Sequence, residues 1–209
     1  MLDMEKLTSP APRKTGRPLS FDKDAALHQA MLLFWRHGYE ATALSDLTVA
    51  MGVTAPSIYA AFGDKKQLFL LAVDRYLSGP VTAQTIINGA LTAREAAMGL
   101  LQASATGFTG ENTPPGCLLA SSAISCSASA RDVQAALATL RKGIEAHLQA
   151  RIDNAIATGE MPATTDSEAL AAHIMAVIQG LSTLARDGAT REKLLRVANV
   201  AMRSWPADR

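Results

Sequence analysis

The sequence is poor in cysteine and aromatic residues, and it has almost no net charge. Two cysteines in 209 residues are too few for a disulfide framework, which favours a reducing cytoplasm as the location. No run of about 18 apolar residues is present and the N-terminus lacks the apolar centre of a secretory signal, so we expect no association with a membrane. A net charge of +1 excludes a uniformly basic surface, so any contact with nucleic acid needs cations placed locally.

The sequence also lacks the usual signatures of an enzyme or a metalloprotein. No His, Cys, Asp and Glu grouping has metal-ligand spacing, and there is no phosphate-binding glycine loop or nucleophile elbow. We therefore expect no metal, no cofactor and no catalytic residues. Hydrophobic residues make up 48% of the chain and charged residues 19%, which favours a folded protein. Because no segment alternates as a strand does, the fold class is predicted as all-α.

Capping residues and apolar periodicity divide the chain into helices, and the predicted N-caps outside the segment 42–68 include Asp22, Thr92, Thr165 and Thr190. A flexible basic arm, rich in Pro and Gly, occupies residues 1–20. The predicted helices fall in two groups, with a Gly- and Pro-rich loop at 110–116 and a short apolar segment at 117–127 within the second. They are a helix at 22–37, two short ones within 42–63 and one from 64 to about 79, followed by helices at 92–108, 129–159, 165–187 and 190–205.

The most informative segment is residues 42–68, where two short helices are separated by a tight turn. Apolar residues recur at helical spacing on both sides of Gly52, which interrupts the pattern. Thr54 is a good N-cap for the second helix, and Pro56 is allowed in its first turn. Its outer side stays small or polar, so it can enter the major groove of DNA, which is about 12 Å wide. The arrangement is that of a helix-turn-helix, whose second helix contacts bases.

Residues 22–79 resemble the DNA-binding domain of the tetracycline-repressor (TetR) family. LFWRHGY at 33–39, then AT, LSDL, AMGV, SIYAAF and DKKQLF, keep the order and spacing of that family without a gap. The resemblance implies a helix-turn-helix three-helix DNA-binding domain at 21–79 and a helical effector-binding and dimerisation domain at 80–209. It also implies a transcriptional repressor that binds a palindromic double-stranded operator as a homodimer and is released by a small-molecule effector.

The DNA-contacting set combines the outer face of the second short helix with family positions around it. An outward Tyr59 hydroxyl suits a phosphate oxygen, and Lys65 begins the next helix, where an anion is favoured. Ala55 and Pro56 replace more polar family residues, so apolar contact with thymine methyls is expected. The alternatives are helix capping for Thr54 and Ser57, surface packing for Tyr59 and a merely soluble tail for the arm. The candidates are Arg17, Thr42, Ser45, Thr54, Ala55, Pro56, Ser57, Tyr59 and Lys65.

Two further sets come from the C-terminal half. In a protein of this family the middle helices enclose an effector cavity, and the last two helices of each subunit form a four-helix interface. The alternative for both sets is the ordinary core of one chain. The candidate effector pocket consists of Met98, Leu101, Phe108, Cys117, Leu140 and Ile144. The candidate dimer interface consists of Leu170, Ile174, Val177, Leu181, Leu184, Ala198 and Ala201.

Cys117 suggests a second form of regulation. It follows Pro114-Pro115-Gly116 at a predicted helix start, where the positive end of the helix lowers a thiol pKa. A repressor that senses oxidants or electrophiles through Cys117 is therefore an alternative, against the view that Cys117 is a small buried hydrophobic residue. From a different class, an all-helical small-molecule-binding protein or enzyme without DNA binding is also possible.

Overall fold

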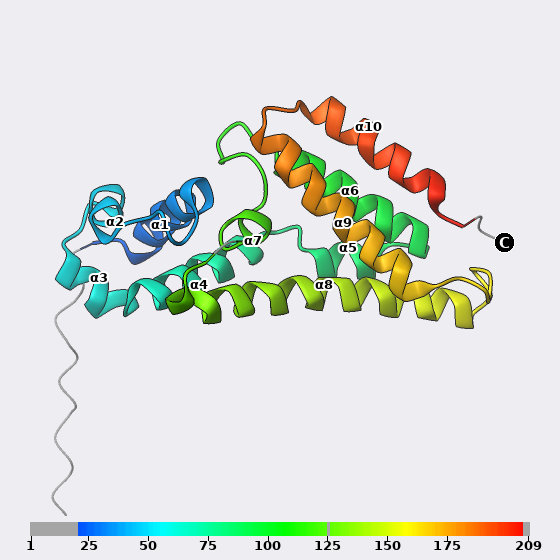
Figure 1. Cartoon of the computed structure of the whole chain (residues 1–209), viewed down its shortest axis with the longest axis horizontal. Coiled ribbons are helices and arrows are strands. Elements are labelled where there is room, and N and C mark those ends of the chain that lie inside the picture. The colour runs from blue at the N-terminus through cyan, green and yellow to red at the C-terminus, as the bar shows by residue number, and fades with distance from the viewer. Residues whose placement is uncertain (1–20, 125, 207–209) are drawn as a thin grey trace, which may run out of the picture.

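The computed structural model describes residues 21–124 and 126–206 of the chain, and every regular element in these ranges is helical. Figure 1 shows the first helices, which we call the head, at one end of an elongated molecule and the last described residues at the other. The helices are α1 (Lys23–His37), α2 (Leu44–Met51), α3 (Ala55–Phe62), α4 (Lys65–Leu77), α5 (Ala83–Gly89), α6 (Ala93–Gly107), α7 (Leu118–Ser121), α8 (Arg131–Ala157), α9 (Ser167–Arg186) and α10 (Arg191–Ala201), with short 3₁₀ turns at Ala128–Ala130 and Met202–Ser204.

The head consists of α1 to α4, and an aspartate side chain caps the first and the last of these helices. Asp22 caps α1 by accepting from the backbone N–H groups of Asp24 and Ala25, and Gly38 ends that helix with φ +83°. The core of the head contains aromatic pairs among aliphatic residues, and the rings of Phe34 and Phe69 meet edge to face with centroids 5.0 Å apart. α1 and α4 therefore pack closely against each other, and the two short helices α2 and α3 pack against this pair.

The C-terminal part is built on the long helix α8 and the helix α9 that packs against it. Figure 1 shows α8 running the length of this part, with α5, α6 and α9 on its upper side and α10 outermost. Leu137, Leu148 and Ile152 of α8 are fully buried, as the predicted apolar stripe requires. The short helix α5 had not been predicted, because only Ile87 of its seven residues is buried.

The segment 116–122, which contains α7, joins the head to the C-terminal part. The indole N–H of Trp35 donates to the carbonyl of Gly116 (3.0 Å), and the N–H of Tyr39 donates to the carbonyl of Ser122 (2.9 Å). From α9, the guanidinium of Arg186 donates to the carbonyls of Trp35 (3.2 Å) and Arg36 (3.1 Å) at the end of α1. The head is therefore attached to the C-terminal part through these hydrogen bonds as well as through a shared apolar core.

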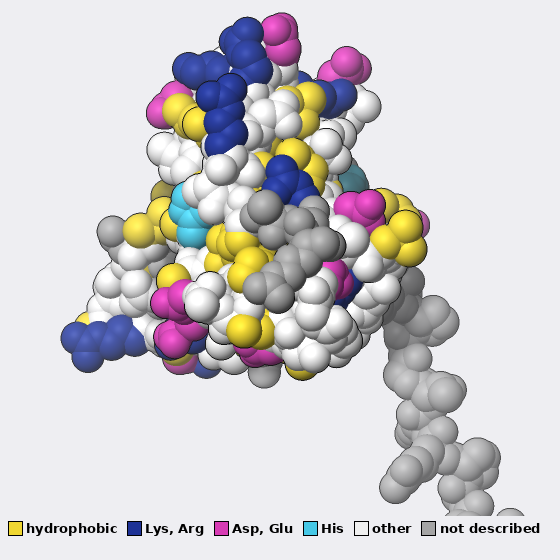
Figure 2. All heavy atoms as spheres, turned by 90° about the vertical axis from the view of Figure 1, so that its right-hand side faces the viewer, with side chains coloured by type: hydrophobic (Ala, Val, Ile, Leu, Met, Phe, Trp, Pro, Cys, Tyr) yellow, Lys and Arg dark blue, Asp and Glu magenta, His cyan; other side chains and the backbone are white. Residues whose placement is uncertain are grey.

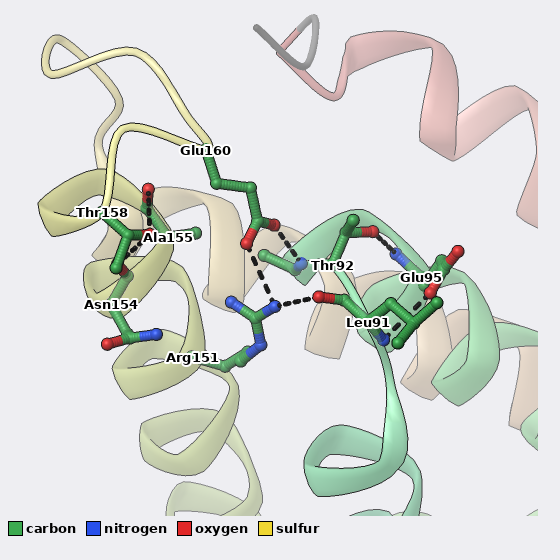
Figure 3. Close-up of polar contacts among 9 residues, drawn as sticks. Leu91, Thr92, Glu95, Arg151, Asn154, Ala155, Thr158 and Glu160 are labelled. Carbon is green, nitrogen blue, oxygen red and sulfur yellow. Dashed lines mark hydrogen bonds and ion pairs between the residues drawn. The ribbon is translucent and has the colours of Figure 1, made fainter.

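An ion pair connects helices at the end of the C-terminal part that lies away from the head (Figure 3). Arg151 of α8 lies 3.1 Å from Glu160, and it also donates to the carbonyl of Leu91 (2.9 Å). The second carboxylate oxygen of Glu160 accepts from the N–H of Ala93 at the start of α6 (2.6 Å). Thr92 caps α6 as predicted, by accepting from the N–H of Glu95. The pair thus holds the end of α8 against the start of α6.

Two features of α9 differ from the prediction. Its N-cap is Asp166, which accepts from the N–H of Ala169, and not the neighbouring Thr165. The helix is also long and apolar enough to cross a membrane, with a mean hydropathy of 1.3 over its most apolar window, although the sequence had suggested no such span. This is weak evidence for a membrane, because a helix in the core of a soluble protein meets the same criterion.

Candidate DNA-binding face and effector cavity

The outer side of α3 is open to solvent, as a reading helix requires. Ile58 and Phe62 turn inward and are buried, whereas Pro56, Tyr59 and Ala60 lie outside. The side chain of Tyr59 is 53% exposed, so its hydroxyl is available to a partner. Tyr59 and its neighbours form what we call the α3 face: Thr54, Ala55, Pro56, Ser57, Tyr59 and Ala60.

Thr54 and Ser57 pair with each other in the α3 face. Thr54 is the N-cap residue of α3, but its side chain accepts no backbone N–H there. Its Oγ1 instead lies 3.0 Å from Oγ of Ser57. The capping role considered for these hydroxyls is therefore not their contact here, and both can exchange this hydrogen bond for one to a base edge or phosphate.

Thr42 does not have the position expected of a phosphate contact. Its side chain is 1% exposed, and its hydroxyl donates to the carbonyl of Gly38 (2.7 Å). It satisfies a backbone acceptor just after α1, so its inclusion among the DNA contacts was wrong. Ser45, from the same candidate set, is exposed in the first turn of α2.

Lys65 stands at the start of α4 as predicted, but its ammonium is engaged within the protein. Nζ lies 3.5 Å from the carbonyl of Glu40 and 4.6 Å from the centre of the Tyr39 ring. Burial lowers the pKa of Lys65, while the carboxylates of Glu40 and Asp46 oppose that shift. A contact with phosphate remains a prediction for Lys65, and it requires the ammonium to turn away from Glu40.

Among the described residues, Lys23 carries a positive charge close to α3, with Nζ 5.1 Å from the centre of the Phe62 ring at the end of that helix. Arg17 and the rest of the predicted arm lie outside the described residues. Figure 2 shows Lys and Arg side chains gathered at the top of the end of the molecule that faces away from the head, where α10 carries Arg191, Lys193 and Arg196.

A cavity of about 290 Å³ lies where the head meets the C-terminal part. Of the candidate effector set, Phe108, Cys117 and Ile144 line it. Met98, Leu101 and Leu140 do not, since Leu101 is fully buried in the core and the other two pack against that core. The wall also contains residues that had not been selected: Trp35 and Tyr76 of the head, and Arg141, Met175, Ile178 and Gln179 of α8 and α9.

Cys117 lines the cavity, but its thiol is not activated. Burial raises the pKa of Cys117, despite partial compensation by the Tyr76 hydroxyl and by backbone N–H groups of α7. Sγ is 3.5 Å from the Tyr76 oxygen, and burial strongly raises the pKa of that hydroxyl too. The lowered thiol pKa expected at this helix start was therefore wrong, because α7 has only four residues and burial outweighs its positive end.

The candidate dimer set divides into two groups. Ile174, Leu181 and Ala198 are fully buried in the core of the chain itself, so they cannot contact a partner and were wrongly included. Leu170, Val177, Leu184 and Ala201 are partly exposed at the edge of the core. Between them α9 exposes small residues, and Val200 of α10 is 57% exposed. A face for a second copy remains available on these two helices.

Among the described residues there is no group of three His, Cys, Asp or Glu side chains that could hold a metal ion.

Comparison with known proteins gives matches over both parts of the chain. The family model described as "Bacterial regulatory proteins, tetR family" matches residues 26–72, and "Tetracyclin repressor-like, C-terminal domain" matches residues 97–201. The HTH-type transcriptional repressor ComR of Escherichia coli (strain K12) is 38% identical over 197 residues, which cover 93% of each chain. The repressor BdcR of the same strain is 25% identical, covering 93% of this chain and 94% of its own.

Solved structures give the same result. A cysteine mutant of the TetR family transcriptional regulator CifR, complexed with a 26-bp double-strand operator DNA, is 39% identical with a TM-score of 0.87. The match covers 91% of this chain and all of that one. A second CifR cysteine mutant with operator DNA is 40% identical, with a TM-score of 0.86 and the same coverage.

Proposed function

The chain belongs to the TetR family of DNA-binding transcriptional regulators, and on this premise we propose that it is a homodimeric repressor released from its operator by a small molecule. The observation that supports this most is the likeness over nearly the whole chain to ComR, a repressor, and to CifR, which binds operator DNA. The exposed α3 face gives the same function a physical basis. Its place of action is the cytoplasm, where the DNA of a bacterium lies.

The α3 face reads its operator largely through apolar contact. Ala55, Pro56 and Ala60 have no hydrogen-bonding side chain, so their partners in the major groove are thymine methyl groups. Tyr59 and Ser45 are exposed on either side of the turn and would hold phosphate oxygens, which set the register of the helix on the duplex. Arg17 would add a contact in the adjacent minor groove.

A dimer supplies the second reading helix that selectivity requires. Two copies joined through α9 and α10 would place their α3 helices one helical turn apart, about 34–36 Å, or a multiple of it, on a palindromic site. Leu170, Val177, Leu184 and Ala201 would pack across the seam, and the exposed Gly180 allows the two copies of α9 to approach closely.

The position of the cavity between the head and the C-terminal part explains how a bound ligand would release the protein from DNA. Its wall combines Trp35 and Tyr76 of the head with residues of α8 and α9, so a ligand there touches both moving parts. A ligand that binds more tightly when the heads are spaced for release shifts the population away from the DNA-bound form. Segment 116–122, bonded to Trp35 and Tyr39, carries the change to the head.

The test is binding to a fragment of the protein's own promoter region, measured by fluorescence anisotropy with random DNA as competitor. Ala60→Glu should weaken specific binding by tenfold or more, because it places a carboxylate among phosphates. Ala157→Glu, the same change at an exposed position of α8 far from the head, should leave binding unchanged. Absence of specific binding at low salt would instead favour a helical small-molecule-binding protein or enzyme.

A second candidate is an electrophile-sensing repressor, favoured by the position of Cys117 in the cavity wall. An electrophile bound there would meet the sulfur directly, although the raised pKa of Cys117 makes the thiol slow toward oxidants in bulk solvent. N-ethylmaleimide, whose double bond takes up the sulfur and the thiol proton, is a suitable probe. Release from DNA should be lost in Cys117→Ser and kept in Cys126→Ser; release that survives in Cys117→Ser excludes this candidate.

A further inference from the structure

The cavity between the head and the C-terminal part has a mostly apolar wall with a single charged residue in the described chain. Among its described lining residues, Arg141 of α8 is the sole charged side chain. Large apolar and aromatic groups make up most of the remaining wall, including Trp35, Phe108 and Ile144. No Asp or Glu of the described chain lines the cavity. A ligand enclosed here therefore meets a positive charge that no protein carboxylate at the wall balances.

The contacts of Arg141 leave most of its donors unused within the described residues. One guanidinium nitrogen, Nη1, donates to the carbonyl of Leu119 (2.6 Å), which orients the group beside α7. The ion pairs of the described chain join Lys66 to Asp132, Arg75 to Asp24, Arg151 to Glu160 and Arg196 to Glu192, so none includes Arg141. A half-buried guanidinium without an acidic partner gains most from an anion that arrives with the ligand.

We propose that the ligand of this cavity is a small organic monoanion, a carboxylic acid with a single apolar body, and that Arg141 binds its carboxylate. The inference rests on the proposed function, in which this cavity is the effector site. A guanidinium offers paired N–H groups that match a carboxylate. Gln179, at the same wall, is placed to add a neutral hydrogen bond.

The volume limits the size of the apolar body. A dry engineered cavity of about 150 Å³ binds benzene, and this one has about 290 Å³. Its ligand should therefore have about 10–14 non-hydrogen atoms by that comparison. Medium-chain aliphatic acids and two-ring aromatic acids meet this limit, whereas a nucleotide or a long-chain acyl group does not.

The same contact connects ligand charge to the head. A carboxylate that draws Arg141 toward itself competes with the Leu119 carbonyl for the guanidinium. Leu119 lies in α7, three residues before Ser122, whose carbonyl accepts from Tyr39 in the head. An acid thus acts on the segment that joins the two parts, whereas an uncharged molecule of equal size does not.

The experiment compares matched acids and amides on the full-length protein by isothermal titration calorimetry. The probes are octanoate with octanamide, and 2-naphthoate with 2-naphthamide. Each acid should bind at least about tenfold more tightly than its amide, since charge-assisted hydrogen bonds are roughly twice as strong as neutral ones. Amides that bind as tightly as acids, or failure of all four probes to bind at millimolar concentration, would overturn the proposal.

Variants separate charge recognition from a structural role of Arg141. Arg141→Gln keeps a donor for the Leu119 carbonyl and should reduce the acid-to-amide ratio to near one, and Arg141→Lys should restore part of it. Lys142→Met, which removes the neighbouring exposed cation, should leave the ratio unchanged. A ratio that survives in Arg141→Gln would mean that Arg141 only holds α7.

Operator binding without any probe is measured in parallel, so that the two proposals fail separately. If the protein binds its operator specifically but binds acid and amide equally well, the proposal of a monoanionic ligand is wrong and the repressor function stands. An acid-selective cavity in a protein that does not bind its promoter fragment contradicts the repressor alone.

Discussion

Removing the carboxylate of Glu160 should destabilise the protein by about 3 kcal/mol without changing its affinity for DNA. Arg151 and Glu160 are 16% and 23% exposed, so their charges are largely withdrawn from water. Breaking a buried pair from one side costs about 3–5 kcal/mol, because the remaining charge is left uncompensated, and partial exposure places this pair at the lower end. One nitrogen of Arg151, Nη1, is already buried without a partner in the described chain. Loss of Glu160 would therefore leave more of the guanidinium without a hydrogen-bond acceptor.

The measurement is urea and thermal unfolding of Glu160→Ala by circular dichroism at one protein concentration. For a chain of this length, about 3 kcal/mol corresponds to a fall in Tm of roughly 6–12 °C. The double variant Arg151→Met/Glu160→Met should recover at least half of the loss, since it removes both charges. Operator affinity at 20 °C should match the native protein, because the pair joins the end of α8 to the start of α6 (Figure 3), and that end of α8 lies away from α3 (Figure 1). A loss below about 0.5 kcal/mol for Glu160→Ala would refute the reasoning.

Three further outcomes are expected. Gly116→Ala should cost about 1–3 kcal/mol in urea unfolding, because φ is +81° and a Cβ would lie 2.9 Å from the Ser182 carbonyl oxygen; an unchanged midpoint would contradict this. Tyr59→Phe should weaken operator binding a few-fold in anisotropy assays at unchanged Tm, since the lost hydroxyl is exposed. Burial raises the pKa of the Cys117 thiol and of the Tyr76 hydroxyl. As pH rises, both groups therefore stay neutral in the folded protein after the same groups have begun to ionise in the unfolded chain. Stability should therefore be complete below the ordinary thiol value of 9.0 and fall above it, and Cys117→Ala should show a smaller fall in Tm between pH 8 and pH 10.

Features governed by nearby residues could be predicted from the sequence. Asp22, Thr92 and Thr190 cap the helices that they were expected to cap, because each N-cap depends on backbone groups two or three residues away. Tyr59 turns outward for a similar reason, since Ile58 and Phe62 of the same helix face the core. The resemblance to the TetR family, and not the helix itself, predicted that this helix belongs to a DNA-binding domain.

Features that depend on long-range packing could not be predicted. Cys117 has a raised pKa because residues far along the chain bury it, and this burial outweighs the opposing effect of the Tyr76 hydroxyl. Trp35 was assigned to the head by its place in the sequence, yet it forms part of the cavity wall. Thr42 matched a family position, but its hydroxyl turns back to Gly38. In each case the local pattern is compatible with either environment, and only the assembled fold decides between them.

The joint between the head and the rest of the protein has a consequence for how such proteins can diversify. On the head side it combines main-chain atoms with side chains: the carbonyls of Trp35 and Arg36 accept from Arg186 and the N–H of Tyr39 donates to Ser122, while the Trp35 indole donates to Gly116 and Lys66 pairs with Asp132. These residues lie in α1, in α4 and in the turn after α1, and none lies in the reading helix α3. A head with a different reading helix could therefore be grafted onto this sensor with most of its attachment preserved, which makes the two parts interchangeable in evolution and in design.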